Sequence, residues 1–506
     1  MQASNNPFDT DRTTSLGLLE IFFAHISGST YCFLPEYHFR RWVCEESPRK
    51  SRDDLVLIYA VLAMATTYTT PDRDDMKTKG SEYAAIARYA ATGREFSLQL
   101  VQTRLLLSLY YYAINIFHEA WDYSGGALRT ALGMNLNLEL SNAELQSAPT
   151  VYNLNKNGYA ECRRRTFWSC YLMDHFTGFC NNALSTISPE DIFLRVPAKT
   201  KHFESQSEFL GPFFDSARIP IPDVLENAGV MAYLVNICSI WGDVRANIYR
   251  SSQASASISS EPFSTFYTNI NMRLDAWRTS LPENLKFTAE NLDSKLNLAI
   301  SGSFMTMHSI YHVTHVKLNR YLKQESVSPY QLEHSIRLTY QHSNAIFKLA
   351  DIVATRTSRM AHSPAAQRPF SSLYTGFAVL VAVDVMTAKG YLSEIPALRH
   401  RLEGAKRIID ELANFWFCAR KQQFMLAQRI EMLNGLERGG GGWNATNGTS
   451  RASALGDEVI VDKERSVYEM KTAMDSTAKG SDDCIYKVGW ETYIKALQEA
   501  GWNSPR

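Results

Sequence analysis

The stretch that decides the fold is Glu161–Pro197, ECRRRTFWSCYLMDHFTGFCNNALSTISPEDIFLRVP. Three consecutive arginines lead into an aromatic pair, and a single acid, Asp174, follows within the same expected helix. After that helix, Ser188-Pro189-Glu190-Asp191 has the order of a helix start, with a capping serine, a proline in the first turn and an acid at the third position. The stretch therefore predicts a long helix, a loop and a second helix start.

Helical spacing brings the side chains of this stretch together. Arg164 lies four residues before Trp168, Phe167 lies four before Tyr171, and Asp174 follows Tyr171 by three. We expect an aromatic ridge with an arginine stacked over it, which would join two helices. The set Arg164, Phe167, Trp168, Tyr171 and Asp174 is therefore predicted to be a structural junction and not a site of chemistry.

Outward from this stretch, the chain has helical patterns on both sides. Apolar residues recur at intervals of three and four from Ser15 onward, and Leu55–Thr67 is apolar on all faces, as in a buried helix. No alternating strand pattern with hairpin turns stands out. We predict an all-α fold, a large multi-helical array with two helical halves. The other helices expected are 81–92, 97–117, 121–137, 221–250, 263–281, 296–322, 328–354, 374–389 and 396–434.

The predicted organisation has five parts. Residues 1–14 are polar and expected to be flexible, 15–198 form an N-terminal helical half that carries the motifs, and 199–437 form a C-terminal helical half. A flexible linker is expected over 438–480, because Gly439–Gly442 precedes neither a Lys-Ser pair nor a helix signal. Residues 481–506 form a terminal amphipathic helix. Its acids and aromatics suit docking on a co-activator, but we favour a last helix that folds back on the domain.

Charge and cysteine content limit the function. The 506 residues carry 52 Lys and Arg against 52 Asp and Glu, whereas nucleic-acid binders usually present a basic face. The eight cysteines contain no C-x-x-C pair, so neither a zinc finger nor a binuclear zinc cluster can be written. No apolar run reaches the length of a membrane span. We expect a soluble, intracellular protein that does not bind DNA on its own.

The region Ser97–Pro197 resembles the regulatory middle region of fungal zinc-cluster transcription factors. That family shares S-L-x-x-x-Q-x-x-L-L-L-x-x-Y, then A-W…G-x-A-x-R-x-A-x-x-L-G-L, then R-R-R-x-W-W-x-x-Y-x-x-D. The matching residues are Ser97, Leu98, Gln102, Leu105, Leu106, Leu107, Tyr110, Ala120, Trp121, Gly125, Ala127, Arg129, Ala131, Arg163, Arg164, Arg165, Phe167, Trp168, Tyr171 and Asp174. Asn135 replaces a family glycine, and Asn181-Asn182-Ala183 replaces a Gly-Arg-Pro. Weaker matches at 274–282 and 307–320 extend the resemblance from about Leu16 to Asn434.

The resemblance implies the regulatory domain of a fungal transcription factor that controls RNA polymerase II transcription by sensing a small effector or a partner. It implies a protein of the nucleus, or one that shuttles between cytoplasm and nucleus. Zinc is expected only in an N-terminal cluster missing from this chain, which itself needs no cofactor. The implied partners are a small-molecule effector, a co-activator or full-length regulator, DNA only indirectly, no membrane, and a second copy in a homodimer.

The resemblance also implies an interior that holds the effector. Aromatic and apolar walls with few polar groups suit small metabolites. We predict an effector pocket formed by Phe96, Leu106, Tyr110, Phe117, Trp121, Trp168 and Phe179.

Three other groups of residues could have a chemical role, and for each we weigh that role against a purely structural one. His308, His312 and His315 share a helical face and could offer metal ligands, but no acid or cysteine nearby completes a set, so we favour packed histidines. The Arg163–Arg165 run could touch phosphate, but the aromatics beside it favour an exposed or stacked face. Cys170 and His175 lie five apart on one helix, a separation that points their side chains away from each other.

We predict no enzyme, because G-x-S-x-G, a phosphate-binding loop and a dinucleotide fingerprint are all missing. Two alternatives to a regulatory domain remain. One is a free-standing scaffold that binds a partner or competes with a full-length regulator. The other is a biosynthetic helper enzyme on the same helical frame, which would require a pocket with titratable groups.

Overall fold

A computed structural model of the chain describes residues 6–27, 30–45, 50–69, 74–181, 185–217, 227–253, 263–295, 301–320, 328–360, 373–388 and 395–440. Over these ranges the fold is all-α, as predicted, and extended segments meet only in isolated bridges. No helix in the described ranges has the length and apolarity that a membrane crossing requires.

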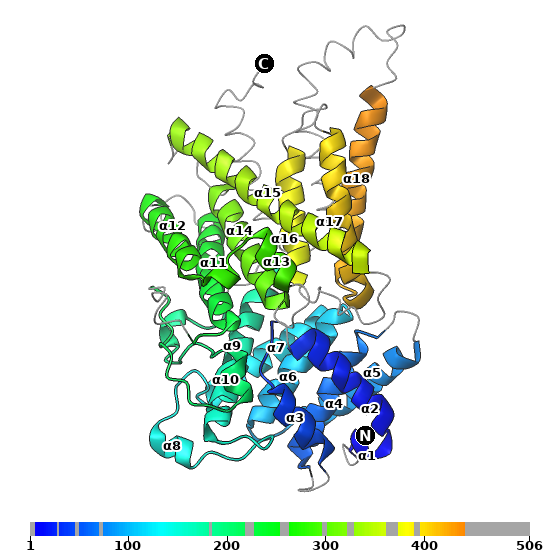
Figure 1. Cartoon of the computed structure of the whole chain (residues 1–506), viewed down its shortest axis with the longest axis vertical. Coiled ribbons are helices and arrows are strands. Elements are labelled where there is room, and N and C mark those ends of the chain that lie inside the picture. Colours follow the sequence, from blue (N-terminus) through cyan, green and yellow to red (C-terminus); the bar gives the residue numbers. More distant parts are fainter. Residues whose placement is uncertain are drawn as a thin grey trace.

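The N-terminal half forms the lower part of the molecule in Figure 1. Its elements are α1 (Pro7–Thr10), α2 (Arg12–Phe22), the π-helical turn η1 (Phe23–Ser27), α3 (Glu36–Cys44), α4 (Arg52–Thr66), α5 (Asp74–Ala91), α6 (Leu98–Ala113), α7 (Phe117–Gly133), α8 (Asn142–Gln146), α9 (Lys156–Asn181), the single turn η2 (Pro189–Asp191) and α10 (Thr200–Glu204).

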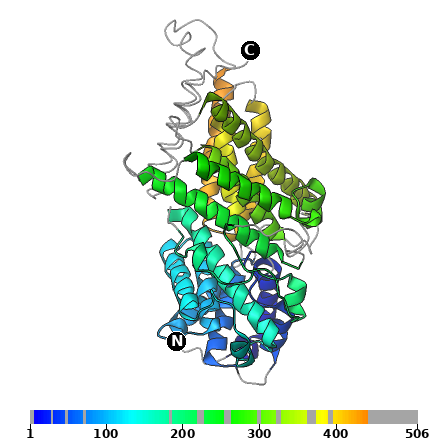
Figure 2. The same cartoon turned by 90° about the vertical axis from the view of Figure 1, so that its left-hand side faces the viewer.

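The C-terminal half lies above it, and the quarter-turn view of Figure 2 shows the same two tiers. Its elements are α11 (Val230–Gln253), α12 (Phe263–Ser280), the turn η4 (Glu283–Leu285), α13 (Ala289–Lys295), α14 (Ser301–Arg320), α15 (Pro329–Met360), α16 (Leu373–Ala388), α17 (Ile395–Phe415) and α18 (Ala419–Gly440).

Helix α4 is the centre of the N-terminal half. Its first turn is closed by a reciprocal capping box, in which the Ser51 hydroxyl accepts from the Asp54 amide and the Asp54 carboxylate accepts from the Ser51 amide. From Leu55 to Thr66 every side chain is buried, as the all-apolar pattern predicts. The helix packs against α2, α5 and α6, so its position organises the lower tier.

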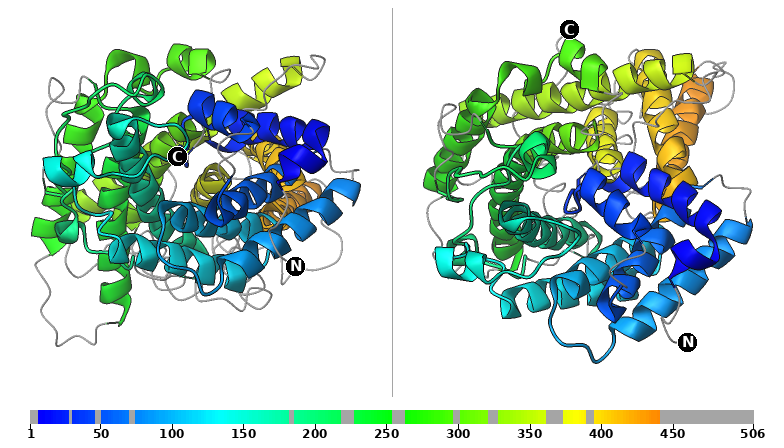
Figure 3. Two further views of the ribbon diagram at one scale, coloured as in Figure 1. Left: turned by 90° about the horizontal axis from the view of Figure 1, so that it is seen from below. Right: turned by 60° about the horizontal axis from the view of Figure 1, so that its bottom comes forward.

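Aromatic contacts join the two tiers at separate places. The ring of Tyr68, just after α4, stacks on Phe415 at the end of α17 with centroids 5.2 Å apart, and the Phe417 amide donates to the Ala113 carbonyl. On the other side, Phe176 of α9 lies 5.8 Å from Tyr374 of α16. In the left view of Figure 3, which looks from below, the blue and cyan helices of the lower tier lie in front of the upper tier.

Two boundaries of the predicted organisation differ from the structure. Within the stretch 1–14 that was expected to be flexible, the described residues form α1 and the start of α2, which Asn6 and Asp11 cap, and Phe8 is buried. Residues 199–214 belong by their contacts to the lower tier: the Glu204 carboxylate accepts from the amides of Glu36 and Tyr37.

Two predicted helices also differ. The expected helix 396–434 is broken into α17 and α18, with a turn at Trp416–Cys418. The predicted helix start at Ser188 forms only the single turn η2, because the Ser188 hydroxyl bonds Glu190 and does not cap a backbone amide.

Other predictions fall on residues that the structure does not describe. The replaced Gly-Arg-Pro motif lies partly at 182–184, and the terminal helix 481–506 lies wholly outside the described residues. Helix α18 continues to Gly440, past the start of the predicted linker, and the rest of the linker lies outside as well.

Gly229 offers a test of how closely the segment before α11 approaches the segment after α9. A Cβ atom at Gly229 would lie 2.3 Å from the Ala198 carbonyl oxygen, whereas a Cβ atom at Gly125, within α7, would meet nothing within 4 Å. We expect Gly229→Ala to lower the free energy of unfolding by about 1–3 kcal/mol because backbone must move. Gly125→Ala should raise it by about 0.5–1 kcal/mol because the helix gains a better helix former.

Urea unfolding of the full chain measures both variants of this pair. Equal stability of Gly229→Ala and the unsubstituted chain would contradict the close approach.

Candidate functional site

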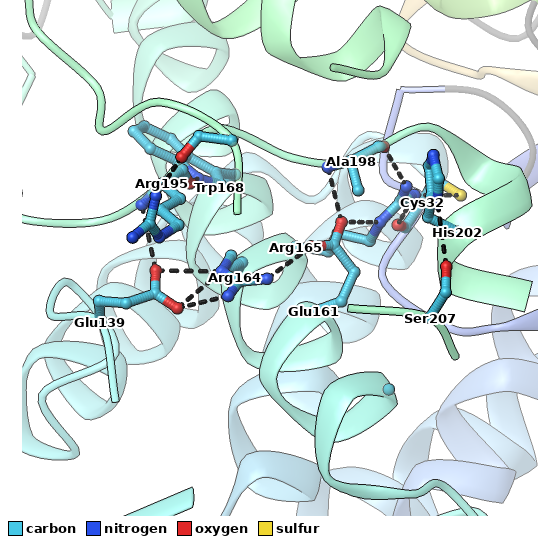
Figure 4. Close-up of polar contacts among 12 residues, drawn as sticks. Cys32, Glu139, Glu161, Arg164, Arg165, Trp168, Arg195, Ala198, His202 and Ser207 are labelled. Atoms are coloured by element: carbon cyan, nitrogen blue, oxygen red, sulfur yellow. Dashed lines mark hydrogen bonds and ion pairs between the residues drawn. The ribbon is translucent and has the colours of Figure 1, made fainter. Parts of the chain in front are cut away.

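The site is built where the segment after α9 returns along that helix. Residues 193–198 are extended and pair on one side with 137–139, where the Phe193 amide donates to Asn137 and the Glu139 amide donates to Phe193. On the other side the Phe214 amide donates to the Leu194 carbonyl at 2.9 Å. These pairings bring side chains from distant parts of the sequence onto the arginine face of α9, as Figure 4 shows.

The carboxylate of Glu161 is the centre of this site. One of its oxygens accepts from Arg165 Nε at 2.8 Å and from the Ala198 amide at 2.9 Å, and the other accepts from Arg164 Nη1 at 3.0 Å. The Glu161 side chain is 5% exposed. A carboxylate this buried is tolerated because cations and hydrogen bonds surround it.

Arg164 connects Glu161 to a second carboxylate. Its Nε lies 2.9 Å and 3.0 Å from the two oxygens of Glu139, and its Nη2 donates to the same group. Glu139 also accepts from the Arg195 amide at 3.2 Å. Arg164 thus bridges the helix to both extended segments in the planar, bidentate manner that suits a guanidinium.

Besides Glu161, Arg165 bonds to different groups from those of Arg164. Its Nη2 donates to the Ala198 carbonyl at 2.8 Å and its Nη1 to the Cys32 carbonyl at 3.1 Å. Its guanidinium lies 4.6 Å from the centre of the Phe203 ring. Arg165 therefore stacks on Phe203, a ring outside the predicted ridge, whereas we expected an arginine to stack on the ridge itself.

The four side chains Glu139, Glu161, Arg164 and Arg165 form a network with no net charge. Burial alone would lower the pKa of Arg164, but its bonds to Glu139 and the charge of Glu161 hold that pKa above its ordinary value. Of the exposed or stacked face predicted for the arginine run, the exposed form is wrong, because all three arginines are buried, whereas Arg165 is stacked on Phe203. Their donors are directed at carboxylates and carbonyls, which leaves the phosphate interpretation without support.

The aromatic part of the predicted junction lies one turn further along α9. Trp168 is fully buried, its Nε1 donates to the Arg195 carbonyl at 2.9 Å, and its ring meets Phe214 edge-on at 5.0 Å. Phe167 and Tyr171 flank it at 5.5 Å and 5.4 Å. The ridge packs on the returning extended segment and joins it to the helix.

Asp174 closes the loop that follows α9. Its carboxylate accepts from the amide and the hydroxyl of Thr186 at 2.6 Å and 2.9 Å. The five predicted junction residues thus lie along one face of α9, and the structure gives each side chain packing or hydrogen-bonding contacts.

Sequence reasoning missed the partners of this network. Glu161 precedes Arg164 and Arg165 by three and four residues, a spacing that favours ion pairs and was available in the sequence. Glu139, Cys32, Phe203 and Phe214 carry no such signal, because only the tertiary fold brings them to α9.

The seven residues of the predicted effector pocket have different surroundings. Leu106, Tyr110 and Trp168 are buried, Phe117 is half-buried against Tyr112, and Phe96 and Trp121 are exposed. The Phe179 side chain lies outside the described residues. A pocket formed by this set stays a prediction. Its buried members are Leu106, Tyr110 and Trp168.

The remaining sequence candidates are packed groups. His308 shares a hydrogen bond with the Leu285 carbonyl, and burial lowers its pKa to about 4. Within the described residues no three His, Cys, Asp or Glu side chains are arranged to hold a metal. Burial raises the pKa of the Cys170 thiol and lowers the pKa of His175, whose Nδ1 meets the Tyr171 carbonyl. These shifts oppose a thiolate–imidazolium pair.

Comparison with known proteins identifies a protein family that includes this region. A family model described as the fungal specific transcription factor domain matches residues 19–279, which is 261 of 506 residues. The match includes the whole network around Glu161.

Three similar proteins carry related names. An uncharacterized transcriptional regulatory protein of Schizosaccharomyces pombe is 28% identical over 70% of this chain and 35% of its own length. The Zn(2)-C6 fungal-type transcription factor FTF1c of Fusarium oxysporum f. sp. lycopersici is 28% identical over 58% of this chain and 32% of its own length. A second S. pombe regulatory protein is 24% identical over 79% of this chain and 50% of its own length.

The chain therefore spans about a third to a half of the length of these relatives. The family and the relatives are transcription regulators and not enzymes, in agreement with the prediction that this chain is not an enzyme.

Trp168 tests the aromatic part of the junction. We expect Trp168→Ala to lower the free energy of unfolding by about 3–5 kcal/mol, because it leaves a cavity and removes the bond to the Arg195 carbonyl. Trp168→Phe should cost less, since it keeps a ring against Phe214. The melting temperature of the full chain measures both, and an unchanged value for Trp168→Ala would refute this placement.

Proposed function

The chain belongs to the fungal specific transcription factor domain family, and we propose that it is the regulatory body of a fungal transcription regulator that senses a small effector or a partner protein. In this proposal it acts on RNA polymerase II transcription in the nucleus. The observation that carries the proposal is the family match over residues 19–279, which contains the buried network and the aromatic ridge of α9.

DNA contact in this proposal is indirect. The 506 residues contain no C-x-x-C pair and carry no net charge, whereas a sequence-independent grip on DNA comes from clustered lysines and arginines. The longest basic run, Arg163–Arg165, is buried. Relatives are named Zn(2)-C6 factors, so a zinc cluster outside this sequence, or on a partner regulator, would place the domain on DNA.

Regulation requires two arrangements whose balance an effector or a partner can shift. The contacts between the tiers suit this requirement, because the stacking of Tyr68 on Phe415 and the contact of Phe176 with Tyr374 are packing of rings, which can rearrange at small cost. The lower tier, by contrast, is fixed by directional bonds around Glu161. We therefore place the response at the contact between the tiers, and the effector near Leu106, Tyr110 and Trp168.

A reporter assay tests the proposal. The full chain is fused to a bacterial DNA-binding domain in a yeast strain whose reporter carries the matching site. We expect the fusion to change reporter output by at least about fivefold relative to the DNA-binding domain alone, the lower end of typical regulatory coupling. Glu161→Gln should abolish the effect by unfolding the site.

Glu190→Gln is the matched control for this assay. Glu190 is exposed and its carboxylate accepts a hydrogen bond from the Ser188 hydroxyl, so this variant should behave as the unsubstituted fusion does. Output equal to that of the DNA-binding domain alone, at equal protein levels, would contradict a transcriptional role.

A further inference from the structure

Four histidines lie between two helices of the upper tier. Helix α14 is buried along its whole length and packs against α11, α15 and α16. It carries His308, His312 and His315, and α15 presents His342 to the last two. The sequence interpretation named the first three, but His342 has no spacing that relates it to them.

The rings of His312, His315 and His342 are in direct contact. The Nδ1 atoms of His312 and His342 are 2.9 Å apart, a hydrogen-bond distance. The His315 ring stacks on the His342 ring with centroids 3.9 Å apart and an angle of 13° between planes. We call these three residues the histidine cluster.

The contact between His312 and His342 depends on protonation. A neutral imidazole has one donor and one acceptor nitrogen, whereas an imidazolium has two donors. An Nδ1–Nδ1 bond therefore requires one of the two rings to keep an unprotonated Nδ1. Once both rings are protonated the bond is lost, and two cations lie within 2.9 Å.

The cluster has little to stabilise a charge. His312 Nε2 and both nitrogens of His315 are buried without a hydrogen-bond partner in the part of the chain that the structure describes. Tyr311 meets all three rings edge-on, at 5.2, 4.8 and 5.7 Å, and Phe287 lies 5.0 Å from His312. Unpartnered polar atoms in such a place cost stability and call for a role.

The charged neighbours oppose protonation. Arg278 of α12 lies beside His315 and Tyr311, and its positive charge disfavours a second cation there. His308 acts in the same sense on His312. Asp275 lies near Tyr311 and is the acid among these neighbours, but Arg278 pairs with it at 3.4 Å. On the far side of α14, Lys317 is directed at the Phe377 ring of α16.

We propose that the histidine cluster is a proton-operated latch between α14 and α15, which is closed while its rings are neutral and opens when the surrounding solution acidifies. Opening exposes the rings to water, where they can hold protons. Because α14 also packs on α16, whose Tyr374 contacts Phe176 of the lower tier, opening disturbs the contact between the tiers. The inference concerns the fold and does not depend on the transcriptional role.

The direction of the pH dependence follows from burial. Burial and the neighbouring cations lower the pKa of His312 and His315 well below the ordinary value, and burial lowers the pKa of His342 to about 4. The closed state thus binds fewer protons than the open one below about pH 6.5. The latch between α14 and α15 therefore has its full stability above that pH and loses it as the pH falls toward 4.

Amide hydrogen exchange on the full chain, corrected for the intrinsic pH dependence of exchange, tests the latch. Between about pH 7 and about pH 5, we expect protection of α14 and α15 to fall at least about tenfold more than protection of α4 and α6, because each ring that is protonated only in the open state weakens protection by up to about tenfold per pH unit below its ordinary pKa of about 6.5. An equal fall in both regions would overturn the proposal.

Two variants remove a titratable ring in different ways. His315→Phe keeps a stacked ring and loses no hydrogen bond, because neither nitrogen of His315 has one. His342→Asn keeps a polar group at the Nδ1 position but cannot be protonated. Each should make the differential loss of protection about tenfold smaller, because one proton-binding ring is gone and the other two remain. His315→Phe should be at least as stable as the unsubstituted chain at neutral pH.

His334→Asn is the matched control, since His334 is a half-buried histidine on the same helix, α15, and shares an exposed hydrogen bond with Arg337. It should keep the full differential response. If His342→Asn fails to fold, His315→Phe alone decides: a response equal to that of the unsubstituted chain would refute the latch.

Discussion

One buried carboxylate, that of Glu161, determines how the lower tier closes. It lies near the start of α9 and accepts hydrogen bonds from Arg164, from Arg165 and from the Ala198 amide. Removing these charges from water costs several kcal/mol for each ion unless each charge is paired with an opposite charge and satisfied by hydrogen bonds. The arginines can therefore stay inside only while Glu161 and Glu139 are in place. The extended segment that contains Ala198 must in turn lie against α9, because its backbone groups are satisfied there.

The two tiers are held together by a different kind of contact. Inside the lower tier the bonds are directional and charged. The close approach of Gly229 to Ala198 positions the start of α11 against the segment that these bonds hold. Between the tiers, aromatic rings pack against each other, as Tyr68 does on Phe415 and Phe176 does on Tyr374. Apolar packing of this kind can settle in more than one arrangement at small cost, whereas a buried ion network cannot. A lower tier fixed by ions beneath an upper tier that can repack, with the proton-operated latch that we propose between α14 and α15, would suit the sensing role that we propose.

Local sequence signals predicted the helices but not their partners. The apolar run at Leu55–Thr67 and the junction residues on α9 were found because helical spacing puts them on faces that must be buried. The partner of Arg164, Glu139, was not predicted, because it lies 25 residues earlier in a segment without a pattern of its own. The turn after Phe415 was missed because no proline or glycine marks it, and tertiary contacts of Trp416 and Phe417 make the break. His342 escaped for the same reason as Glu139: its partners come from another helix.

The central claim is that Glu161 and the arginines form one energetic unit, and a double-mutant cycle tests it most directly. Glu161→Gln, Arg165→Met and the double variant are compared with the unsubstituted chain by urea unfolding, and Met keeps the alkyl packing of the arginine. The account predicts a coupling free energy of about 1.5–3 kcal/mol, because either single change strands a buried charge and the double change does not. Additive effects within about 0.5 kcal/mol would contradict it.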